Sequence, residues 1–161
     1  MPDQVLTSDD KRDLRLWMRR LRKDLPDREL RGERIWEQVV SMTEVHRARR
    51  ILVFTTIPGE PPTAPFLAWC DADGKETAVP EDNVDPGWPD VVVVPGLAFT
   101  ADGERLGQGG GWYDRFLPDV RDNCTTIGVC FEPQLVDVLP VEPHDVRLDY
   151  VVSDVKTAPP G

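Results

Sequence analysis

The sequence predicts an α/β protein, a single three-layer domain in which a mostly parallel sheet lies between helices. Short unbroken apolar runs at residues 51–54 and 91–94 are typical of strands that are covered on both faces, and residues 126–130 are a further predicted strand. Segments with helical spacing of apolar residues lie before and between these runs, and alternating strands and helices favour a parallel sheet. With 161 residues the chain can build one core, so we expect one domain over residues 1–161.

Two helices are predicted in the first 50 residues. Acidic residues at 9 and 10 follow Thr7 and Ser8, a pattern that favours a helix start, and Pro26 ends this helix. Its apolar residues are Leu14, Trp17, Met18, Leu21 and Leu25. Asp27 can cap the second helix, which ends near Val45. The apolar side of that helix includes Leu30, Ile35, Trp36, Val39 and Val40.

The rest of the chain alternates strands, loops and short helices. We expect a loop at 57–62, a helix at 64–70 stopped by Gly74, a weak strand at 77–79, a connection at 81–89, a helix starting near Trp112, a short helix at 134–138 and a last strand at 150–152. Ligands of parallel sheets collect at the carboxyl ends of the strands. The loops after Phe54, Val94 and Cys130 are therefore the candidate positions for a site.

Charge and composition narrow the function classes. Residues 1–50 carry 13 Lys and Arg against 10 Asp and Glu, whereas residues 51–161 carry 6 against 19. An acidic body disfavours nucleic acid but allows a small polyanion on the basic helices. Three cysteines without a C-x-x-C pair favour buried thiols over a disulfide or zinc site. With neither a long apolar run nor a secretory signal, we expect a soluble, cytoplasmic protein without membrane contacts.

The segment 94–116 carries the clearest functional signal. It joins an apolar strand to a loop with four glycines at 107, 109, 110 and 111, then to Trp112, Tyr113, Asp114 and Arg115. Loop glycines let backbone N–H groups converge on an anion, although glycines also simply shape sharp connections. Neither the Rossmann nor the Walker spacing is matched. The neighbouring arginines and the aspartate favour a nucleotide phosphate site over a purely structural loop.

The motif R-L-G-x-G-G-G-aromatic-Tyr-Asp-Arg-Phe-Leu, preceded by V-P-G-L-A-F, resembles the ATP-binding segment of the 5-formyltetrahydrofolate cyclo-ligases. The resemblance extends to a K-x-x-x-R pair near the N-terminus and to residues 127–145. It implies the cyclo-ligase fold, which is of the NagB/RpiA-like type, and residues that bind ATP. These are Lys11, Arg15, Arg105, Leu106, Gly107, Gln108, Gly109, Gly110, Gly111, Trp112 and Tyr113, with Lys11, Arg15 and Arg105 as the catalytic cations.

Lys11 and Arg15 share one helix face, and positive charge there suits phosphoryl transfer. Such cations are otherwise a solvated helix edge, which is our interpretation of Arg12, Arg19 and Arg20.

The resemblance also implies a metal site and a substrate site. Asp114 and Asp145 are assigned to Mg²⁺, which needs few carboxylates when phosphate and water complete its shell. Taken singly, Asp114 is also a favourable first-turn acid and Asp145 an ordinary turn residue. His144 is interpreted as polar surface. The substrate site would use Glu60, Gln108, Gly109, Gly110, Gly111 and Trp112.

Glu60 in that set could bind the N–H groups of a pterin or be an unengaged loop residue. Trp112 and Tyr113 could stack on a heterocycle or pack into the core.

The implied reaction is the ATP- and Mg²⁺-dependent conversion of 5-formyltetrahydrofolate to 5,10-methenyltetrahydrofolate by a monomer acting on small molecules. The resemblance implies a connection of several tens of residues before the strand at 91–94, but here only residues 81–89 remain, a loss that affects the folate pocket more than the ATP site. The alternative is therefore a non-catalytic nucleotide-binding or regulatory relative. An RNA-binding module on the basic helices ranks below both, because no aromatic-basic RNA motif is present.

Overall fold

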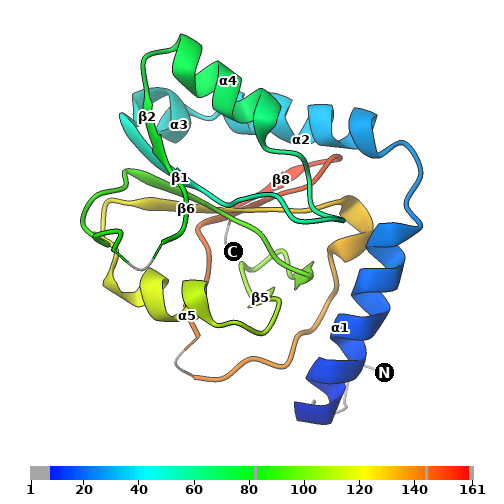
Figure 1. Cartoon of the computed structure of the whole chain (residues 1–161). Coiled ribbons are helices and arrows are strands. Elements are labelled where there is room, and N and C mark those ends of the chain that lie inside the picture. The colour runs from blue at the N-terminus through cyan, green and yellow to red at the C-terminus, as the bar shows by residue number, and fades with distance from the viewer. Residues whose placement is uncertain (1–7, 82, 144, 160–161) are drawn as a thin grey trace.

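The computed structural model describes residues 8–81, 83–143 and 145–159. Its main sheet has six strands in the order β2-β1-β3-β6-β7-β8 (Figure 1). All neighbouring pairs are parallel except β7 with β8. The strands of this sheet are β1 (Arg50–Val53), β2 (Glu76–Ala78), β3 (Val91–Val94), β6 (Thr125–Val129), β7 (Tyr150–Val152) and β8 (Thr157–Ala158). The mostly parallel α/β fold predicted from the sequence is confirmed.

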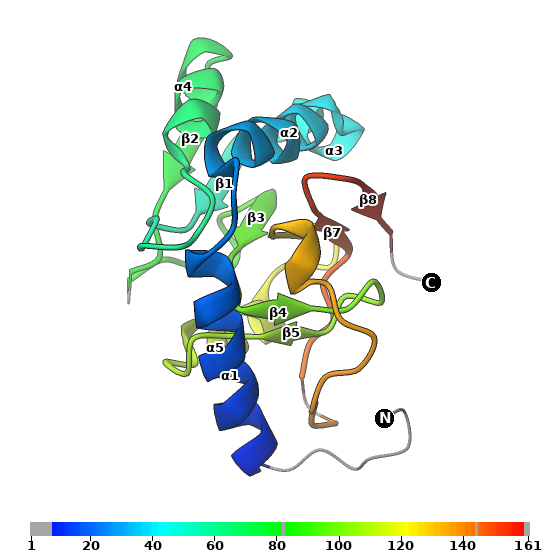
Figure 2. The ribbon, with the colours of Figure 1, turned by 90° about the vertical axis from the view of Figure 1, so that its right-hand side faces the viewer.

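Helical segments cover both faces of this sheet. In Figure 1, α2, α3 and α4 lie above it, and α5 and a small antiparallel hairpin of β4 with β5 lie below it. The helical elements are α1 (Ser8–Lys23), α2 (Arg28–Ser41), α3 (Thr43–Arg47), α4 (Ala64–Ala72), α5 (Trp112–Phe116) and the 3₁₀ turns η1 (Leu117–Asp119) and η2 (Glu132–Gln134). Figure 2 shows α1 running alongside the hairpin. None of the described helices combines the length and apolar character that crossing a bilayer requires.

Two apolar clusters hold these layers together. The larger one extends over both faces of the sheet, and on the upper face Trp36 of α2 stacks on Phe66 of α4 with ring centroids 4.9 Å apart. All four valines of β3 are buried, which explains why this strand is an unbroken apolar run. The smaller cluster joins Met18 of α1 to the hairpin. It fixes α1 beside the loop that follows the hairpin.

The structure differs from the sequence prediction in three strand-rich places. The hairpin of β4 (Ala98–Phe99) and β5 (Arg105–Leu106) and the edge strand β8 were not predicted, because two-residue strands are too short for a periodic pattern. The helix predicted at 134–138 is wrong. Its Leu135 forms a parallel bridge with Phe99, and the N–H of Val136 donates to the Phe99 carbonyl, so this segment is extended.

The N-terminal helices also depart from prediction in detail. Trp17 is 62% exposed rather than part of the buried stripe. Asp27 occupies the N-cap position of α2 with φ of 56°, but its side chain makes no capping bond. The predicted second helix breaks at Met42 into α2 and α3. Thr7 and His144 lie outside the described residues. The three cysteines are buried and free, as predicted.

The strand order creates a switch point between β1 and β3. From β1 the chain crosses through α4 to β2 on one side, and from β3 it crosses through α5 to β6 on the other. The two crossover helices lie on opposite faces of the sheet (Figure 1). The loops that leave the carboxyl ends of β1 and β3 therefore diverge and leave room for a ligand.

The turn of the hairpin depends on Gly103, which we expect to be intolerant of any side chain. Its φ is 93°, and a Cβ would lie 2.3 Å from the backbone oxygen of Leu148. Gly103→Ala is therefore expected to lower the free energy of unfolding by about 4 kcal/mol, from left-handed strain plus a backbone clash. Gly74→Ala is the matched control, because Gly74 has φ of 76° and open space around it. Urea denaturation of Gly74→Ala should show a decrease of only about 1 kcal/mol in the free energy of unfolding. Equal decreases for the two variants would show that the backbone clash at Gly103 has no effect.

Candidate active site

A small cavity of about 230 Å³ lies at the switch point. Its lining comes from the loops after β1 and β3, from Pro80 after β2 and from the glycine loop. These residues are Phe54, Thr55, Ile57, Glu60, Pro80, Pro95, Gln108 and Tyr113. We call it the Glu60 cavity. It lies where ligands of open parallel sheets bind.

Glu60 is a buried carboxyl in this cavity, 7% exposed. The Ile57 N–H donates to its Oε1 at 3.0 Å, which fixes the turn around Gly59. Burial raises the pKa of Glu60, while the Ile57 hydrogen bond and the positive charges of Arg22 and Arg105 act in the opposite direction. The carboxyl is thus desolvated but surrounded by groups that favour its ionised form.

Two further polar groups of the Glu60 cavity lack partners. The hydroxyl of Tyr113 and the amide nitrogen of Gln108 are buried without a hydrogen bond in the part of the chain that the structure describes. Burial raises the pKa of Tyr113, so its phenol stays neutral. Buried polar atoms without partners cost about 1–3 kcal/mol each. Their convergence on one cavity is typical of a binding site whose ligand supplies the missing partners.

A second cavity of about 360 Å³ lies between the hairpin, α5 and the loop before β7. Asp114 and Asp145, predicted from distant parts of the sequence, both line it together with Arg105 and Glu142. We call it the Asp114 cavity. The side chain of Asp114 is 61% exposed, and Oδ2 of Asp145 accepts the N–H of Glu142 at 2.8 Å. The fold therefore brings the two carboxylates to one hollow.

Arg105 lies between the two cavities. Its Nε donates to the Pro95 carbonyl at 2.9 Å, its Nη1 lies 3.7 Å from Oδ1 of Asp114, and its guanidinium lies 5.2 Å from the centre of the Tyr113 ring. Burial lowers the pKa of Arg105, and the charges of Asp114, Glu60 and Asp145 oppose that shift. One fixed cation therefore acts on residues of both cavities.

The cations of α1 contact the same region, as their predicted roles require. Lys11 Nζ lies 3.6 Å from Glu142 at the Asp114 cavity, and Arg15 Nε donates to the Gly107 carbonyl at 3.0 Å. Arg19, interpreted from the sequence as a solvated edge, is exposed and also donates to the Gln108 carbonyl at 3.2 Å.

The glycine loop is open where a ligand could approach. A Cβ on Gly109 or Gly110 would meet no atom within 4 Å, whereas one on Gly107 would lie 2.9 Å from the Arg105 guanidinium. Gly111, with φ of 76°, precedes α5. Because α5 has only five residues, its dipole is a weaker anion attractor than the sequence suggested.

Two predicted ligand residues lie elsewhere. Trp112 stacks on Phe116 with centroids 4.6 Å apart and lines a separate hollow with Val84 and Pro86. Leu106 is buried in the smaller apolar cluster. The structure does not bring either side chain to the Glu60 or the Asp114 cavity.

Sequence reasoning missed the buried residues that hold the loops. Nε2 of Gln134 donates to the carbonyls of Gly96 and Leu97 at 3.0 and 2.9 Å, and its Oε1 accepts the Phe131 N–H at 2.9 Å. This one side chain ties the loop after β3 to the loop after β6. No pattern around Gln134 signals burial, because a single glutamine on a turn usually faces solvent.

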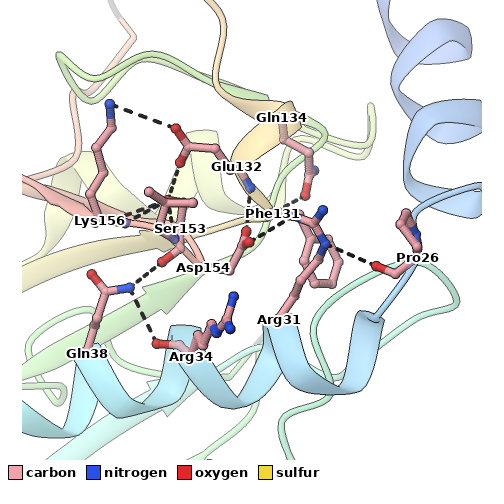
Figure 3. A network of polar contacts seen from close by, with 11 residues as sticks. Pro26, Arg31, Arg34, Gln38, Phe131, Glu132, Gln134, Ser153, Asp154 and Lys156 are labelled. Atoms are coloured by element: carbon pink, nitrogen blue, oxygen red, sulfur yellow. Dashed lines mark hydrogen bonds and ion pairs between the residues drawn. The ribbon is translucent and has the colours of Figure 1, made fainter.

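A polar network fastens the same edge of the sheet to α2 (Figure 3). Asp154 accepts from Nη1 of Arg31 at 2.8 Å and from the Glu132 N–H at 2.6 Å. Gln38 of α2 donates to the carbonyl of Ser153, next to Asp154. Because Asp154 is buried and these bonds join segments more than a hundred residues apart, the network makes the loops after β6 and β7 a rigid support for the site.

Fold and cavities together define a doubly wound α/β protein with one cavity at the switch point of its sheet and a second between α5 and the hairpin. Two solved structures share this fold with a TM-score of 0.80 and 24% identity. One is a 5,10-methenyltetrahydrofolate synthetase from Mycoplasma pneumoniae, and the match covers 90% of this chain and 99% of that chain. The other is the Aquifex aeolicus 5,10-methenyltetrahydrofolate synthetase, and the match covers 92% of each chain.

Sequence comparison finds similarity to one family. Residues 83–154 match the model of the 5-formyltetrahydrofolate cyclo-ligase family. A cyclo-ligase from Mycolicibacterium smegmatis is 42% identical over 67 residues, which are 42% of this chain and 34% of that protein. The Mus musculus cyclo-ligase is 32% identical over 94 residues, 56% of this chain and 46% of that protein. The matched segments thus span between a third and a half of these two relatives.

Proposed function

We propose that this protein converts 5-formyltetrahydrofolate to 5,10-methenyltetrahydrofolate, using Mg²⁺ and ATP and releasing ADP and phosphate. The observation that carries the proposal is the position of Arg105 between two cavities of different chemistry. The Asp114 cavity offers carboxylates and nearby cations, which suit a metal-bound triphosphate. The Glu60 cavity offers a carboxyl and unpartnered polar atoms, which suit a heterocycle.

The residues of the Asp114 cavity fit Mg²⁺. No group of three or more His, Cys, Asp or Glu side chains with metal-site spacing occurs among the described residues. Mg²⁺ does not need one, because it commonly takes one or two carboxylates and completes its shell with phosphate and water. Asp114 and Asp145 would hold the ion. When bound, it supplies positive charge that neutralises phosphate oxygens.

The remaining chemistry is positioning and charge stabilisation. The formyl oxygen attacks the γ-phosphate, and ADP leaves. N10 then attacks the carbon that bears the phosphorylated oxygen and loses its proton, and phosphate leaves. Lys11, Arg15 and the loop amides bind the triphosphate, and Arg105 stabilises charge on the transferred phosphoryl group. Glu60 orients the heterocycle through its N–H groups. The reaction requires no protein nucleophile, and groups of the substrates themselves gain and lose the protons.

The short connection between β2 and β3 favours a second candidate. Residues 79–90 connect the two strands, and among those that the structure describes only Pro80 lines the Glu60 cavity. The volume of this cavity, about 230 Å³, is small for a whole folate. A nucleotide-binding relative without turnover would keep the Asp114 cavity and need no folate pocket.

One assay separates the two candidates. Purified protein with Mg·ATP and 5-formyltetrahydrofolate is expected to produce the near-ultraviolet absorbance of the methenyl product, with one ADP formed per product. Chelating the metal with EDTA should stop both signals. Calorimetric binding of Mg·ATP without any methenyl absorbance would instead support the non-catalytic relative.

A further inference from the structure

Arg22 is a buried cation with unused hydrogen-bonding capacity. It lies in the last turn of α1 and is 4% exposed. Its Nε and Nη1 are buried without a partner among the residues that the structure describes. Burying a charge without compensation is strongly unfavourable, so such a side chain is rare unless a nearby group uses it.

The guanidinium packs against the turn that carries Glu60. A Cβ built on Gly59 would lie 3.3 Å from Arg22 Nε and 3.4 Å from its Nη2, and Gly59 has φ of 95°. Glycine at position 59 therefore allows both the turn and the close approach of Arg22. The next residue is Glu60, whose carboxyl lines the Glu60 cavity. Arg22 thus supports the cavity from behind without lining it.

The surrounding charges single out Glu60 as the partner of Arg22. Burial lowers the pKa of Arg22, the Glu60 charge opposes that shift, and the positive charges of Arg19 and Arg28 reinforce it. Around Glu60 itself stand Arg22 of α1, Arg105 of β5, the phenol of Tyr113 and the Ile57 N–H. The positive charges of two arginines on different elements therefore act on one desolvated carboxyl.

We propose that Arg22 is a positioning residue: its guanidinium fixes the Gly59–Glu60 turn and keeps the Glu60 carboxylate ionised toward the Glu60 cavity. This inference rests on the proposed function for the identity of the ligand. An ionised carboxylate only accepts hydrogen bonds, so it selects a ring edge that presents N–H donors. A neutral carboxyl would offer an O–H and lose that selectivity.

The test compares Arg22→Met with Arg22→Lys, which keeps the charge. Arg22→Met is expected to raise the KM for 5-formyltetrahydrofolate about tenfold, the loss of one charge-assisted hydrogen bond, and to leave the KM for ATP within about twofold. Without the cation, the pKa of Glu60 is higher. As the pH is lowered, the KM for 5-formyltetrahydrofolate should therefore begin to rise at a higher pH than in the wild type. Arg22→Lys should restore most of both properties.

Arg20→Met is the matched control, because Arg20 is exposed on the same helix. It should leave both KM values unchanged. Equal changes in both KM values and in kcat for Arg22→Met would indicate a merely structural role and overturn the proposal, as would an unchanged folate KM. If Arg22→Met does not fold, Arg22→Lys is the deciding variant. A Glu60 carboxyl that titrates at the same pH as in the wild type supports the proposal, and one that titrates at higher pH overturns it.

A readout independent of turnover separates this inference from the proposed function. The Glu60 carboxyl can be titrated by ¹³C NMR, with its signal assigned by its absence in Glu60→Gln. The titration should move to higher pH in Arg22→Met and stay near the wild type in Arg20→Met. If the wild type makes no methenyl product, the proposed function fails, but this shift still decides the role of Arg22. An unmoved titration refutes that role whatever the activity.

Discussion

Replacing Arg105 with methionine is expected to lower kcat for methenyl formation about 10²- to 10³-fold, the usual loss when one preorganised group that stabilises transition-state charge is removed. Arg105 is fixed between the Glu60 and Asp114 cavities by its bond to the Pro95 carbonyl. Its charge therefore needs no rearrangement when the phosphoryl group is transferred. Steady-state kinetics at saturating Mg·ATP would measure the loss.

The conservative variant Arg105→Lys should recover little of the activity. A lysine keeps the charge but not the planar fork that reaches Pro95 and Asp114 together. Arg49→Met, an exposed arginine before β1, serves as the control and should retain full kcat. Thermal unfolding of each variant checks the fold. Wild-type kcat in a folded Arg105→Met protein would remove Arg105 from the mechanism.

The sequence predicted the sheet because its strands carry their own signal. The runs at 51–54 and 91–94 are unbroken because both faces of these strands are covered, and a short apolar run between loops records that burial directly. The hairpin of β4 and β5 carries no such signal. Two paired residues in each strand are too few to show a periodic pattern. The pairing also depends on contacts with α1 and Gln134, which are distant in the sequence.

The site could be predicted only as far as its loops. Glu60 and the glycine loop follow β1 and β3, so their proximity follows from the parallel sheet. The parallel sheet does not predict which cations of the first helix become buried. Arg19, Arg20 and Arg22 look alike in the sequence, but the structure buries Arg22 next to Gly59 and leaves Arg20 exposed.

The sequence left two alternatives open for Trp112, stacking on a heterocycle or packing into the core. In the structure its ring stacks on Phe116, one turn further along α5.

Asp114→Ala is expected to abolish metal-dependent nucleotide binding while leaving the fold intact. The Asp114 side chain is mostly exposed, and its nearest cation is Arg105 at 3.7 Å, so truncation should change the free energy of unfolding by no more than about 0.5 kcal/mol. The loss of one of two carboxylates should weaken Mg·ATP binding at least about tenfold and lower kcat/KM about 10²- to 10³-fold. Calorimetry with ATP, with and without Mg²⁺, measures the effect.

The control Asp119→Ala removes an exposed acid five residues further on, in η1, and should bind Mg·ATP normally. Two mechanisms could connect Asp114 to ATP, and metal dependence distinguishes them. If Asp114 holds the ion, its loss weakens ATP binding only when Mg²⁺ is present. If it mainly orients Arg105, the loss appears equally without the metal. ATP binding that is unchanged in both conditions would refute both roles, and the Asp114 cavity would then have to serve another ligand.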